Sequence, residues 1–293
     1  MMEFVKAEKE KAKLRLALAG PSGSGKTFTA LRLAAGIGGR VALVDTEHNT
    51  AIKYADRFEF DVLALDQHDP DMYAQAIALA GKAGYDVLII DSLTHAWQAL
   101  LNYVDQVAKT KFRGNTWSAW SEGRPKQRRL VDAILAYPGH VIVTMRVKTD
   151  WAVESDGGKS RPVRVGLAPE QDKGIEYEFD MLMELNLDHA GHVTKDRSTR
   201  FQDRVILEPG EDLGREMAEW LMEGAEPRPR PKAETGTGTV LYSRAGLLKR
   251  LKKLQAEADQ LDIEYVVLDE EVSDQEILDE GKRLAAQVNN GRE

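Results

Sequence analysis

One eight-residue stretch constrains this chain more than any other. Residues 20–27 read GPSGSGKT and match the phosphate-binding loop pattern G-x-x-x-x-G-K-[ST] at every fixed position. An apolar run of strand length, residues 14–19, precedes the loop, and residues 27–37 have the composition of a helix. Between a strand and a helix, the backbone N–H groups of such a loop converge on phosphate oxygens. The stretch therefore predicts a nucleoside triphosphate site.

The fixed positions of the loop have separate chemical roles. We expect Lys26 to reach the β- and γ-phosphates and Thr27 to offer its hydroxyl to Mg²⁺. ATP and Mg²⁺ are the expected ligand and cofactor. The predicted phosphate-binding residues are Gly20, Ser22, Gly23, Ser24, Gly25, Lys26 and Thr27.

Charge and composition exclude several classes of protein. The 293 residues carry a net charge of −8, so any contact with nucleic acid must come from local basic patches. No apolar run reaches the roughly 18 residues of a membrane span, and the charged N-terminus lacks the apolar core of a signal peptide. Cysteine is absent, which removes disulfides, thiolate metal sites and cysteine nucleophiles. We expect a cytoplasmic protein without a membrane partner.

Strand-like and helix-like runs alternate after the loop. Strands are predicted at residues 40–45, 60–65 and 85–90, and helices at 51–58 and 70–83. This alternation predicts an α/β fold with a mainly parallel central sheet and helices on both faces. Ligands bind such sheets at the carboxyl ends of the strands, where the loop, Glu47 and Asp91 all fall.

Two carboxylates at these strand ends suit ATP hydrolysis. Four apolar residues precede Asp91, which puts its carboxylate where it can hold Mg²⁺, the Walker B role. Glu47 follows the neighbouring strand and can orient or deprotonate an attacking water. The alternative for Glu47 is a solvated acid in a loop.

In combination these motifs resemble those of the RecA-like recombinase ATPases. The resemblance rests on LVDTEHNTAIKYA, LIIDSLTHAW and VIVTMRVK, which begin at residues 43, 88 and 141. The motif order is most similar to minimal, phage-encoded RecA-like ATPases linked to single-strand annealing, over roughly residues 4–225. The resemblance implies a RecA-like P-loop core, a catalytic role for Glu47 and stacking of Tyr54 on adenine.

The chain departs from the family pattern at two points. The acid that the family uses against the adenine edge would fall at Ala51, which leaves the base specificity open. The family's γ-phosphate-sensing glutamine would fall at Thr144 or Met145, depending on the alignment, whereas Arg146 is retained. These departures leave open how the state of ATP is relayed to DNA.

A pair of basic residues points to an oligomer. An alternating strand at 176–187 and a returning strand at 192–197 predict a hairpin that carries Lys195 and Arg197. They resemble the family's paired cations that reach the γ-phosphate of the neighbouring subunit, which implies ATPase activity only in a filament or ring. The alternative is two surface cations. Phe4 and Ala7 are candidate contacts with a neighbouring subunit, or part of a mobile tail.

A basic, aromatic segment points independently to nucleic acid. Residues 109–129 carry seven cationic side chains against one acid, with tryptophans interleaved. On a flexible loop such residues suit single-stranded DNA, because cations follow phosphates and rings stack on bases. The alternative is that the tryptophans pack on the core and the charges form a solvated face. Residues 149–174 are predicted as a second long irregular stretch. The predicted DNA contacts are Lys109, Lys111, Arg113, Trp117, Trp120, Arg124, Lys126, Arg128, Arg146, Lys148, Lys159 and Arg161.

The chain divides into four predicted parts. These are an N-terminal arm (1–13), a RecA-like ATPase core (14–224), a Pro- and Gly-rich linker (225–240) and a small helical C-terminal module (241–293). A capping box at Ser273 predicts the start of the module's second helix. A single-strand-binding protein is a candidate partner of this module.

The sequence favours an ATP-dependent, single-stranded-DNA-binding recombinase that promotes annealing or strand exchange in a phage-infected bacterial cell. Two alternatives remain. One is an ATP-switched loader or mediator for another recombination or replication protein. The other is a P-loop phosphotransferase for a small molecule, with residues 109–129 as its lid.

Overall fold

The computed structural model describes residues 6–156, 159–226, 244–260 and 263–264, with scattered residues between 277 and 287; within 149–156 and 159–167 only the backbone is described. Contacts divide the chain into two units, Met1–Pro227 and Arg228–Glu293. The predictions for Phe4 and for the capping box at Ser273 lie outside the described residues.

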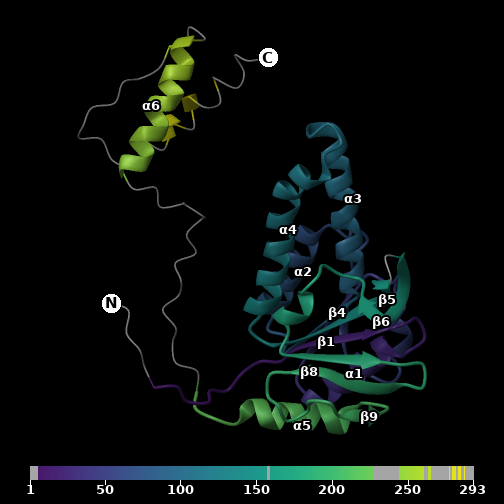
Figure 1. The fold of residues 1–293 in the computed structure, drawn as a ribbon. Coiled ribbons are helices and arrows are strands. Elements are labelled where there is room, and N and C mark those ends of the chain that lie inside the picture. Colours follow the sequence, from purple (N-terminus) through teal and green to yellow (C-terminus); the bar gives the residue numbers. More distant parts are fainter. Residues whose placement is uncertain are drawn as a thin grey trace. The chain divides into compact units, whose positions relative to one another are not determined.

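A mainly parallel sheet forms the centre of the first unit (Figure 1). Its strands are β1 Arg15–Gly20, β2 Val41–Asp45, β3 Asp61–Ala64, β4 Val87–Asp91, β5 His140–Asp156, β6 Lys159–Pro169, β7 Met181–Leu185, β8 Ala190–Asp196 and β9 Val205–Leu207. The spatial order is β3-β2-β4-β5-β1-β7-β8-β9, and β6 pairs with β5 alone. Pairing is parallel from β3 to β7 and antiparallel in β7-β8-β9 and in β5-β6. The predicted α/β fold is confirmed.

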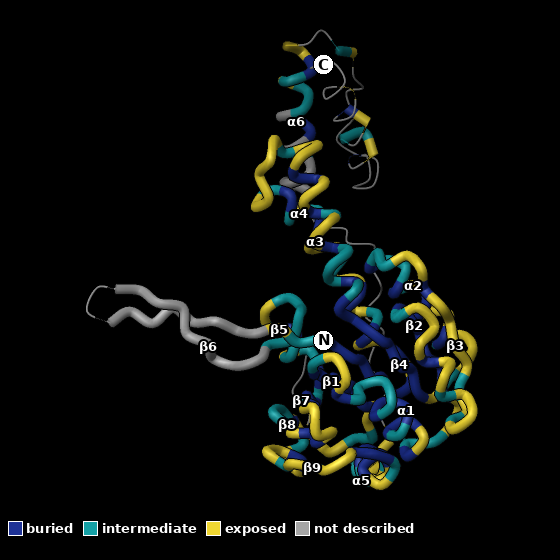
Figure 2. The backbone as a smooth tube through the Cα atoms, turned by 90° about the vertical axis from the view of Figure 1, so that its right-hand side faces the viewer, coloured by how far each residue is buried: buried dark blue, intermediate teal, exposed yellow. Residues whose placement is uncertain are grey.

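Helices cover both faces of the sheet because successive side chains of each strand point to opposite sides. Leu16 and Leu18 of β1 pack with α1 (Lys26–Ile37) and α5 (Glu211–Met222). Ala17 and Ala19 face the side of α2 (Pro70–Ala83), α3 (Leu93–Lys111) and α4 (Thr116–Ala136). Strands β1, β2 and β4 are buried along their whole length, as Figure 2 shows for β4, whereas β3 at the edge is exposed.

The predicted elements before residue 92 agree with the structure to within a few residues. The second, third and fourth predicted strands are β2, β3 and β4, and the helix predicted at 70–83 is α2. Asp69 caps α2 by accepting the N–H of Asp71 at 2.8 Å, and Pro70 occupies its first turn. The helix predicted at 51–58 is shorter, a 3₁₀ turn η1 at Ala51–Tyr54.

The prediction of a flexible loop at residues 109–129 is wrong. Helix α3 continues to Lys111, and α4 begins after Asn115, whose side chain accepts the N–H of Ser118 at 3.1 Å. Gly123 lies where the two helices touch, because a Cβ atom there would come within 2.5 Å of the Val104 side chain. In Figure 1, α3 and α4 extend side by side beyond the sheet.

The prediction of an irregular stretch at residues 149–174 is also wrong for most of its length. Strand β5 runs on to Asp156 and pairs with β6, in a register from Val147 opposite Pro169 to Asp156 opposite Lys159. In the sequence, Gly157-Gly158 between two strand-like runs is a hairpin signal that outweighs the polar composition. The strand predicted at 176–187 begins later, because the short helix η2 (Ile175–Glu178) precedes β7.

Both ends of the first unit meet beside α5. The N–H of Lys11 donates to the carbonyl of Ala225 at 2.9 Å, and that of Ala12 donates to Leu221 at 3.0 Å. The described part of the second unit contains α6, Arg244–Gln260, and an apolar cluster that includes Leu251 and Ile277. Within the described residues, no helix combines the length and the apolarity that a membrane crossing needs.

Candidate active site

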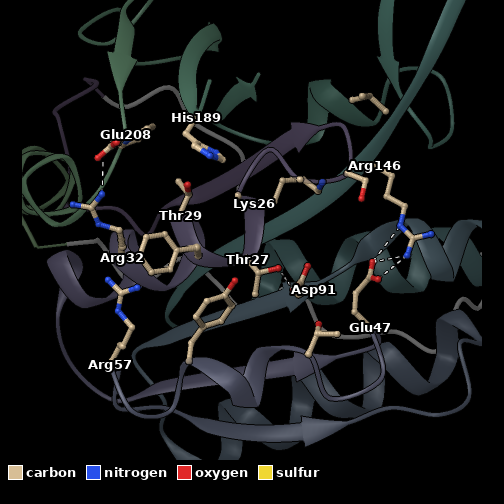
Figure 3. Close-up of a pocket in the computed structure, with 18 of the residues that line it drawn as sticks. Lys26, Thr27, Thr29, Arg32, Glu47, Arg57, Asp91, Arg146, His189 and Glu208 are labelled. Atoms are coloured by element: carbon tan, nitrogen blue, oxygen red, sulfur yellow. Dashed lines mark hydrogen bonds and ion pairs between the residues drawn. The ribbon is translucent and has the colours of Figure 1, made fainter. Parts of the chain in front are cut away.

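A cavity of about 910 Å³ lies at the carboxyl ends of the central strands (Figure 3). Its volume is within the roughly 300–1,000 Å³ typical of sites for small molecules. The phosphate loop and the start of α1 form its floor, and Glu47 just after β2, Asp91 at the end of β4 and Arg146 within β5 contribute polar side chains on one side. The short helix η1, Glu170 directly after β6 and the turns after β7 and β9 also contribute to the lining.

The loop between β1 and α1 has the backbone of a phosphate cradle. Gly23 and Gly25 have φ values of 83° and 86°, in the left-handed region that favours glycine. Both line the cavity, as does Ser22. Gly20 and Ser24 do not line it; Ser24 is fully buried, and a Cβ atom on Gly20 would come within 2.5 Å of the Ser24 hydroxyl. These two residues shape the loop, whereas the other three face the ligand space.

Lys26 and Thr27 occupy the first turn of α1 and line the cavity. The ammonium of Lys26 donates to the carbonyl oxygens of Gly20 at 2.9 Å and Pro21 at 2.8 Å. Burial lowers the pKa of Lys26, while the carboxylates of Asp91 and Glu47 oppose that change. The Lys26 ammonium is therefore hydrogen-bonded to the backbone of the phosphate loop.

Asp91 is a buried carboxylate held by two hydroxyl groups. Thr27 Oγ1 donates to Asp91 Oδ2 at 2.6 Å, and the Thr144 hydroxyl donates to Asp91 Oδ1. Burial raises the pKa of Asp91, which is 2% exposed. A bound cation offsets the cost of keeping such a carboxylate ionised. A carboxylate beside a threonine hydroxyl is a set of hard oxygen donors, and this set fits Mg²⁺.

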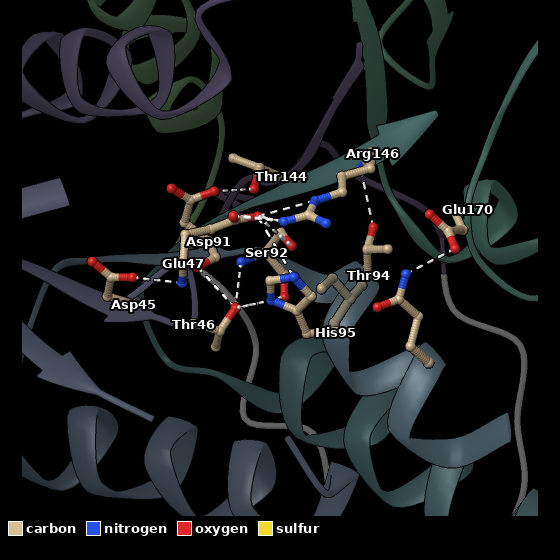
Figure 4. Close-up of polar contacts among 12 residues, drawn as sticks. Asp45, Thr46, Glu47, Asp91, Ser92, Thr94, His95, Thr144, Arg146 and Glu170 are labelled. Carbon is tan, nitrogen blue, oxygen red and sulfur yellow. Dashed lines mark hydrogen bonds and ion pairs between the residues drawn. The ribbon is translucent and has the colours of Figure 1, made fainter. Parts of the chain in front are cut away.

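Glu47 is bound by Arg146 through both of its carboxylate oxygens (Figure 4). Arg146 Nη2 donates to Oε2 at 2.6 Å and to Oε1 at 2.8 Å, and Nε donates to Oε1 at 3.2 Å. The Ser92 hydroxyl donates to Oε1 at 3.3 Å, and His95 Nε2 lies 3.8 Å from the same oxygen. Burial by itself raises the pKa of Glu47, but the hydrogen bonds and charge of Arg146, together with His95 and the Ser92 hydroxyl, hold the pKa below its ordinary value. Glu47 is thus an ionised carboxylate at the cavity wall.

The turn that presents Glu47 is fixed by Asp45 at the end of β2. The carboxylate of Asp45 accepts the N–H of Glu47 at 2.7 Å and that of Ala51 at 3.1 Å. Ala51 is fully buried and does not line the cavity. The family's acid against the adenine edge therefore has no counterpart at this position.

One end of the cavity is aromatic and cationic. Tyr54, the residue predicted to stack on adenine, lines this end, and its ring lies 5.5 Å from that of Phe28. The guanidinium of Arg57 covers the Phe28 ring at 4.6 Å, and Arg32 lines the same region. No sequence motif marks Phe28, Arg32 or Arg57 as site residues. Their only signal is position, because Phe28 follows the phosphate loop and Arg57 lies three residues after Tyr54.

Two further lining residues come from turns. His189, between β7 and β8, has Nδ1 at 3.3 Å from the carbonyl oxygen of Ser24 in the phosphate loop. Glu208, in the turn after β9, also lines the cavity and has a φ of 46°. Neither residue is predictable from the sequence as part of the nucleotide site, because the composition of a turn does not say which site the turn reaches.

The two positions proposed for the phosphate-sensing glutamine do not reach the cavity. Thr144 and Met145 are both fully buried in β5, and neither lines the cavity. Arg146 is the next residue along β5, and it does line the cavity.

Lys195 and Arg197 lie at the end of the sheet opposite to the phosphate loop. Lys195 of β8 is in register with Leu182, near the start of β7, and its ammonium donates to the carbonyl of Phe179 at 2.7 Å. Arg197 Nη1 lies 3.7 Å from Asp180, whose carboxylate accepts the N–H of the first residue of β1. The length of β1, about 20 Å, separates this region from Gly20. Neither cation lines this chain's own cavity.

Most cations of the predicted DNA segment are paired within the core. Lys126 is bound by Asp69 and Asp71 of the α2 N-terminus, at 2.9 and 2.7 Å, and Arg129 also binds Asp71 at 2.8 Å. The remaining pairs are Lys111 with Glu122 at 3.0 Å, Arg124 with Asp172 at 2.6 Å and Arg128 with Asp132 at 2.9 Å. The Arg128–Asp132 pair lies within α4, and the other pairs join α4 to neighbouring segments.

The connection between α3 and α4, which with the adjoining helix ends comprises residues 109–117, retains groups without a partner among the described residues. Lys109 and Arg113 are exposed and have no ion-pair partner among the described residues. Trp117 is 87% exposed. Trp120, in contrast, stacks on Trp97 with ring centroids 5.8 Å apart. The two tryptophans therefore have different environments although they are three residues apart.

The remaining predicted contacts lie elsewhere. Lys148 is exposed on β5, two residues after Arg146. In the β5–β6 pairing, Arg161 is opposite Glu154 and Lys159 is opposite Asp156. Ala7 is exposed.

Comparison with known proteins agrees with this geometry. The profile of the AAA domain family matches residues 12–206, which is more than half of the chain, and the chain therefore belongs to that family. An 81-residue segment is 35% identical to protein RecA of Azoarcus sp. (strain BH72). That segment covers 25% of this chain and 24% of the relative, so the matched part spans about a quarter of each protein. Both findings support a P-loop ATPase of RecA-like type.

Proposed function

We propose that this member of the AAA domain family is an ATPase that assembles as a homo-oligomer on single-stranded DNA and promotes annealing or strand exchange. The observation that carries the proposal is the separation of the charged groups. The cavity holds the phosphate loop, Asp91 and Glu47, whereas Lys195 and Arg197 lie at the other end of the sheet. In a filament or ring, each chain can present these two cations to the cavity of the next.

The residues of the proposed composite site have separate roles in ATP hydrolysis. Lys26 and the loop N–H groups bind the ATP phosphates. Thr27 and Asp91 would hold Mg²⁺, which neutralises charge on the phosphates when it is bound. Glu47 accepts a proton from the attacking water, and the neighbour's two cations stabilise charge on the transferred phosphoryl group.

Single-stranded DNA is proposed to contact the connection between α3 and α4. Lys109 and Arg113 offer cations to the phosphate backbone, and Trp117 offers an exposed ring for base stacking. Arg146 and Lys148, followed in the β5–β6 hairpin by Lys159 and Arg161, are the second proposed set. The internally paired cations of α4 are weaker candidates, because a DNA phosphate would have to displace a carboxylate.

The two alternative functions differ in their support. No residue of 109–129 lines the cavity, so the cavity gives no support to a small-molecule phosphotransferase with this segment as its lid. A loader or mediator switched by ATP remains the second candidate, and for it DNA would not stimulate hydrolysis. The single-strand-binding protein as a partner and the origin in a phage-infected bacterial cytoplasm stay predictions.

The test combines turnover with assembly. ATP hydrolysis is measured with and without oligo(dT), and the same samples are examined by sedimentation velocity. We expect oligo(dT) to stimulate hydrolysis and the chain to sediment as a large assembly with ATP and DNA. Equal turnover by a monomer, with or without DNA, would contradict the proposal.

A further inference from the structure

We propose that Arg146 holds the general base Glu47 in an inactive arrangement and that nucleic acid bound at the β5–β6 hairpin releases it. This inference rests on the proposed function and deepens it, since it names the residue that couples DNA to hydrolysis. It concerns a positioning residue, because Arg146 acts through Glu47.

The contacts of Glu47 explain why the arrangement is inactive. An ionised carboxylate has about four acceptor positions on its two oxygens. Arg146 donates three N–H hydrogen bonds to these positions, and the Ser92 hydroxyl donates a fourth hydrogen bond. Three of these bonds end on Oε1 and one on Oε2, so about one acceptor position, on Oε2, is left for a water. A cation in direct contact also makes the carboxylate a weaker base. A water can be deprotonated efficiently only after Arg146 moves away.

The backbone of Arg146 joins the sheet to the hairpin. Arg146 is in register with Gly20, the first residue of the phosphate loop. Its N–H donates to the Thr94 hydroxyl at 3.0 Å (Figure 4), and its carbonyl accepts the N–H of Glu170 at 2.8 Å. The β5–β6 pairing begins at the next residue, Val147. A displacement of the hairpin therefore acts first on Arg146.

The ligand that competes for Arg146 is a phosphate of the nucleic acid. The Arg146 side chain is 42% exposed, and the exposed cation Lys148 follows two residues later on the same strand. Guanidinium groups bind phosphate in the same bidentate geometry as carboxylate. Because Thr144 and Met145 are buried, Arg146 is the first side chain along this part of β5 that can carry a signal to the cavity.

The test compares Arg146→Ala with the wild type and with Arg204→Ala. Arg204 is a matched control, since it binds both oxygens of Glu216 at 3.0 and 3.1 Å and its pair is exposed to a similar degree, 41% and 32%. Steady-state hydrolysis is measured with and without oligo(dT). We expect Arg146→Ala to raise the DNA-free kcat about tenfold, to leave the KM for ATP within about twofold, and to lose most stimulation by oligo(dT). Arg204→Ala should match the wild type.

The other outcomes separate this inference from the proposed function. If oligo(dT) does not stimulate the wild type, the proposed function fails, and the DNA-free kcat of Arg146→Ala still tests the restraint on Glu47. If oligo(dT) stimulates the wild type but Arg146→Ala hydrolyses slowly in both conditions, Arg146 supports the chemistry and the inference is overturned. If Arg146→Ala does not fold by circular dichroism, Arg146→Lys replaces it. Lysine keeps the charge but lacks the fork of donors, so we expect a smaller rise in the DNA-free kcat, and an unchanged value overturns the inference.

Discussion

The two carboxylates at the cavity, Asp91 and Glu47, differ in environment. Asp91 is 2% exposed, and burial raises its pKa. Glu47 is partly exposed; burial raises its pKa, but the hydrogen bonds and charge of Arg146, together with His95 and the Ser92 hydroxyl, lower it overall. Environments that separate two such groups assign them different chemistry. The buried carboxylate suits a cation, and the ionised one at the wall suits a base.

The role of Glu47 as the base predicts the effect of Glu47→Gln. The amide keeps the size of the side chain but cannot accept a proton, so we expect kcat to fall by about 100-fold or more. The affinity for ATP, measured by titration calorimetry, should stay within about twofold. Asp172→Asn, outside the cavity, is the control. Unchanged hydrolysis in Glu47→Gln would remove Glu47 from the mechanism.

His140 at the start of β5 predicts a pH dependence of stability. Burial, with smaller contributions from Lys13 and Arg15, lowers the pKa of His140 to about 4, and its Nδ1 accepts the N–H of Leu14 at 3.2 Å. Below the unfolded pKa of about 6.5 the unfolded chain takes up a proton that the folded chain does not, so stability falls as the pH drops from 6.5 toward 4.

The change between pH 7.5 and pH 5 amounts to about 2 kcal/mol of unfolding free energy for this one group. Urea unfolding at the two pH values measures it. His140→Asn cannot titrate, so its stability should fall by about 2 kcal/mol less than that of the wild type over the same interval. Equal losses in both proteins would mean that His140 is not held neutral in the folded state.

At the scale of elements, α4 illustrates what charge counting misses. The sequence of residues 109–129 gives seven cations, but five of them pair with carboxylates in the fold. A paired cation holds helices together, whereas an unpaired one is available to a ligand. The segment therefore contains cations whose ion pairs stabilise the fold and unpaired cations that are candidates for DNA binding.

This division predicts opposite effects of two double substitutions. Lys109→Ala/Arg113→Ala should weaken the binding of oligo(dT) and lower its salt dependence by about 0.7 for each DNA phosphate that the variant no longer binds, without changing the melting temperature. Lys126→Ala/Arg129→Ala should cost about 1–2 kcal/mol of unfolding free energy and leave the salt dependence unchanged. Fluorescence anisotropy at several salt concentrations and thermal melts measure the two effects. The reverse pattern would contradict the assignment.

Trp117 is a separate test at the same connection. Its exposed ring has no stacking partner among the described aromatic pairs, whereas Trp120 stacks on Trp97. We expect Trp117→Ala to weaken oligo(dT) binding by about tenfold, the equivalent of one stacked base. Stability should not change. Full affinity in Trp117→Ala would exclude this connection as a stacking platform.

Sequence alone predicts those elements whose signal is local. β2 and β4 are continuous apolar runs, α2 has its cap in Asp69-Pro70, and the phosphate loop is a contiguous motif. The errors depend on distant partners. Gly123 suggests flexibility in the sequence, yet in the fold it lets α3 and α4 approach closely. The ion pair between Glu47 and Arg146 joins residues 99 positions apart, so no local sequence pattern predicts it.

At the scale of the whole molecule, the sheet separates two halves of one proposed site. The phosphate loop follows the end of β1, whereas Lys195 and Arg197 lie beside its beginning. One chain can then bind ATP yet lack the cations that stabilise the transferred phosphoryl group. The proposed functional unit is accordingly the junction between two copies.

Mixing two inactive variants tests that claim most directly. Lys26→Ala lacks the phosphate lysine, and Lys195→Ala/Arg197→Ala lacks the cations for its neighbour. Each alone should show little hydrolysis. In an equimolar mixture with oligo(dT), about a quarter of randomly formed head-to-tail junctions combine an intact loop with intact cations, so we expect about a quarter of the wild-type rate. A mixture no more active than the separate variants would contradict a site shared between chains.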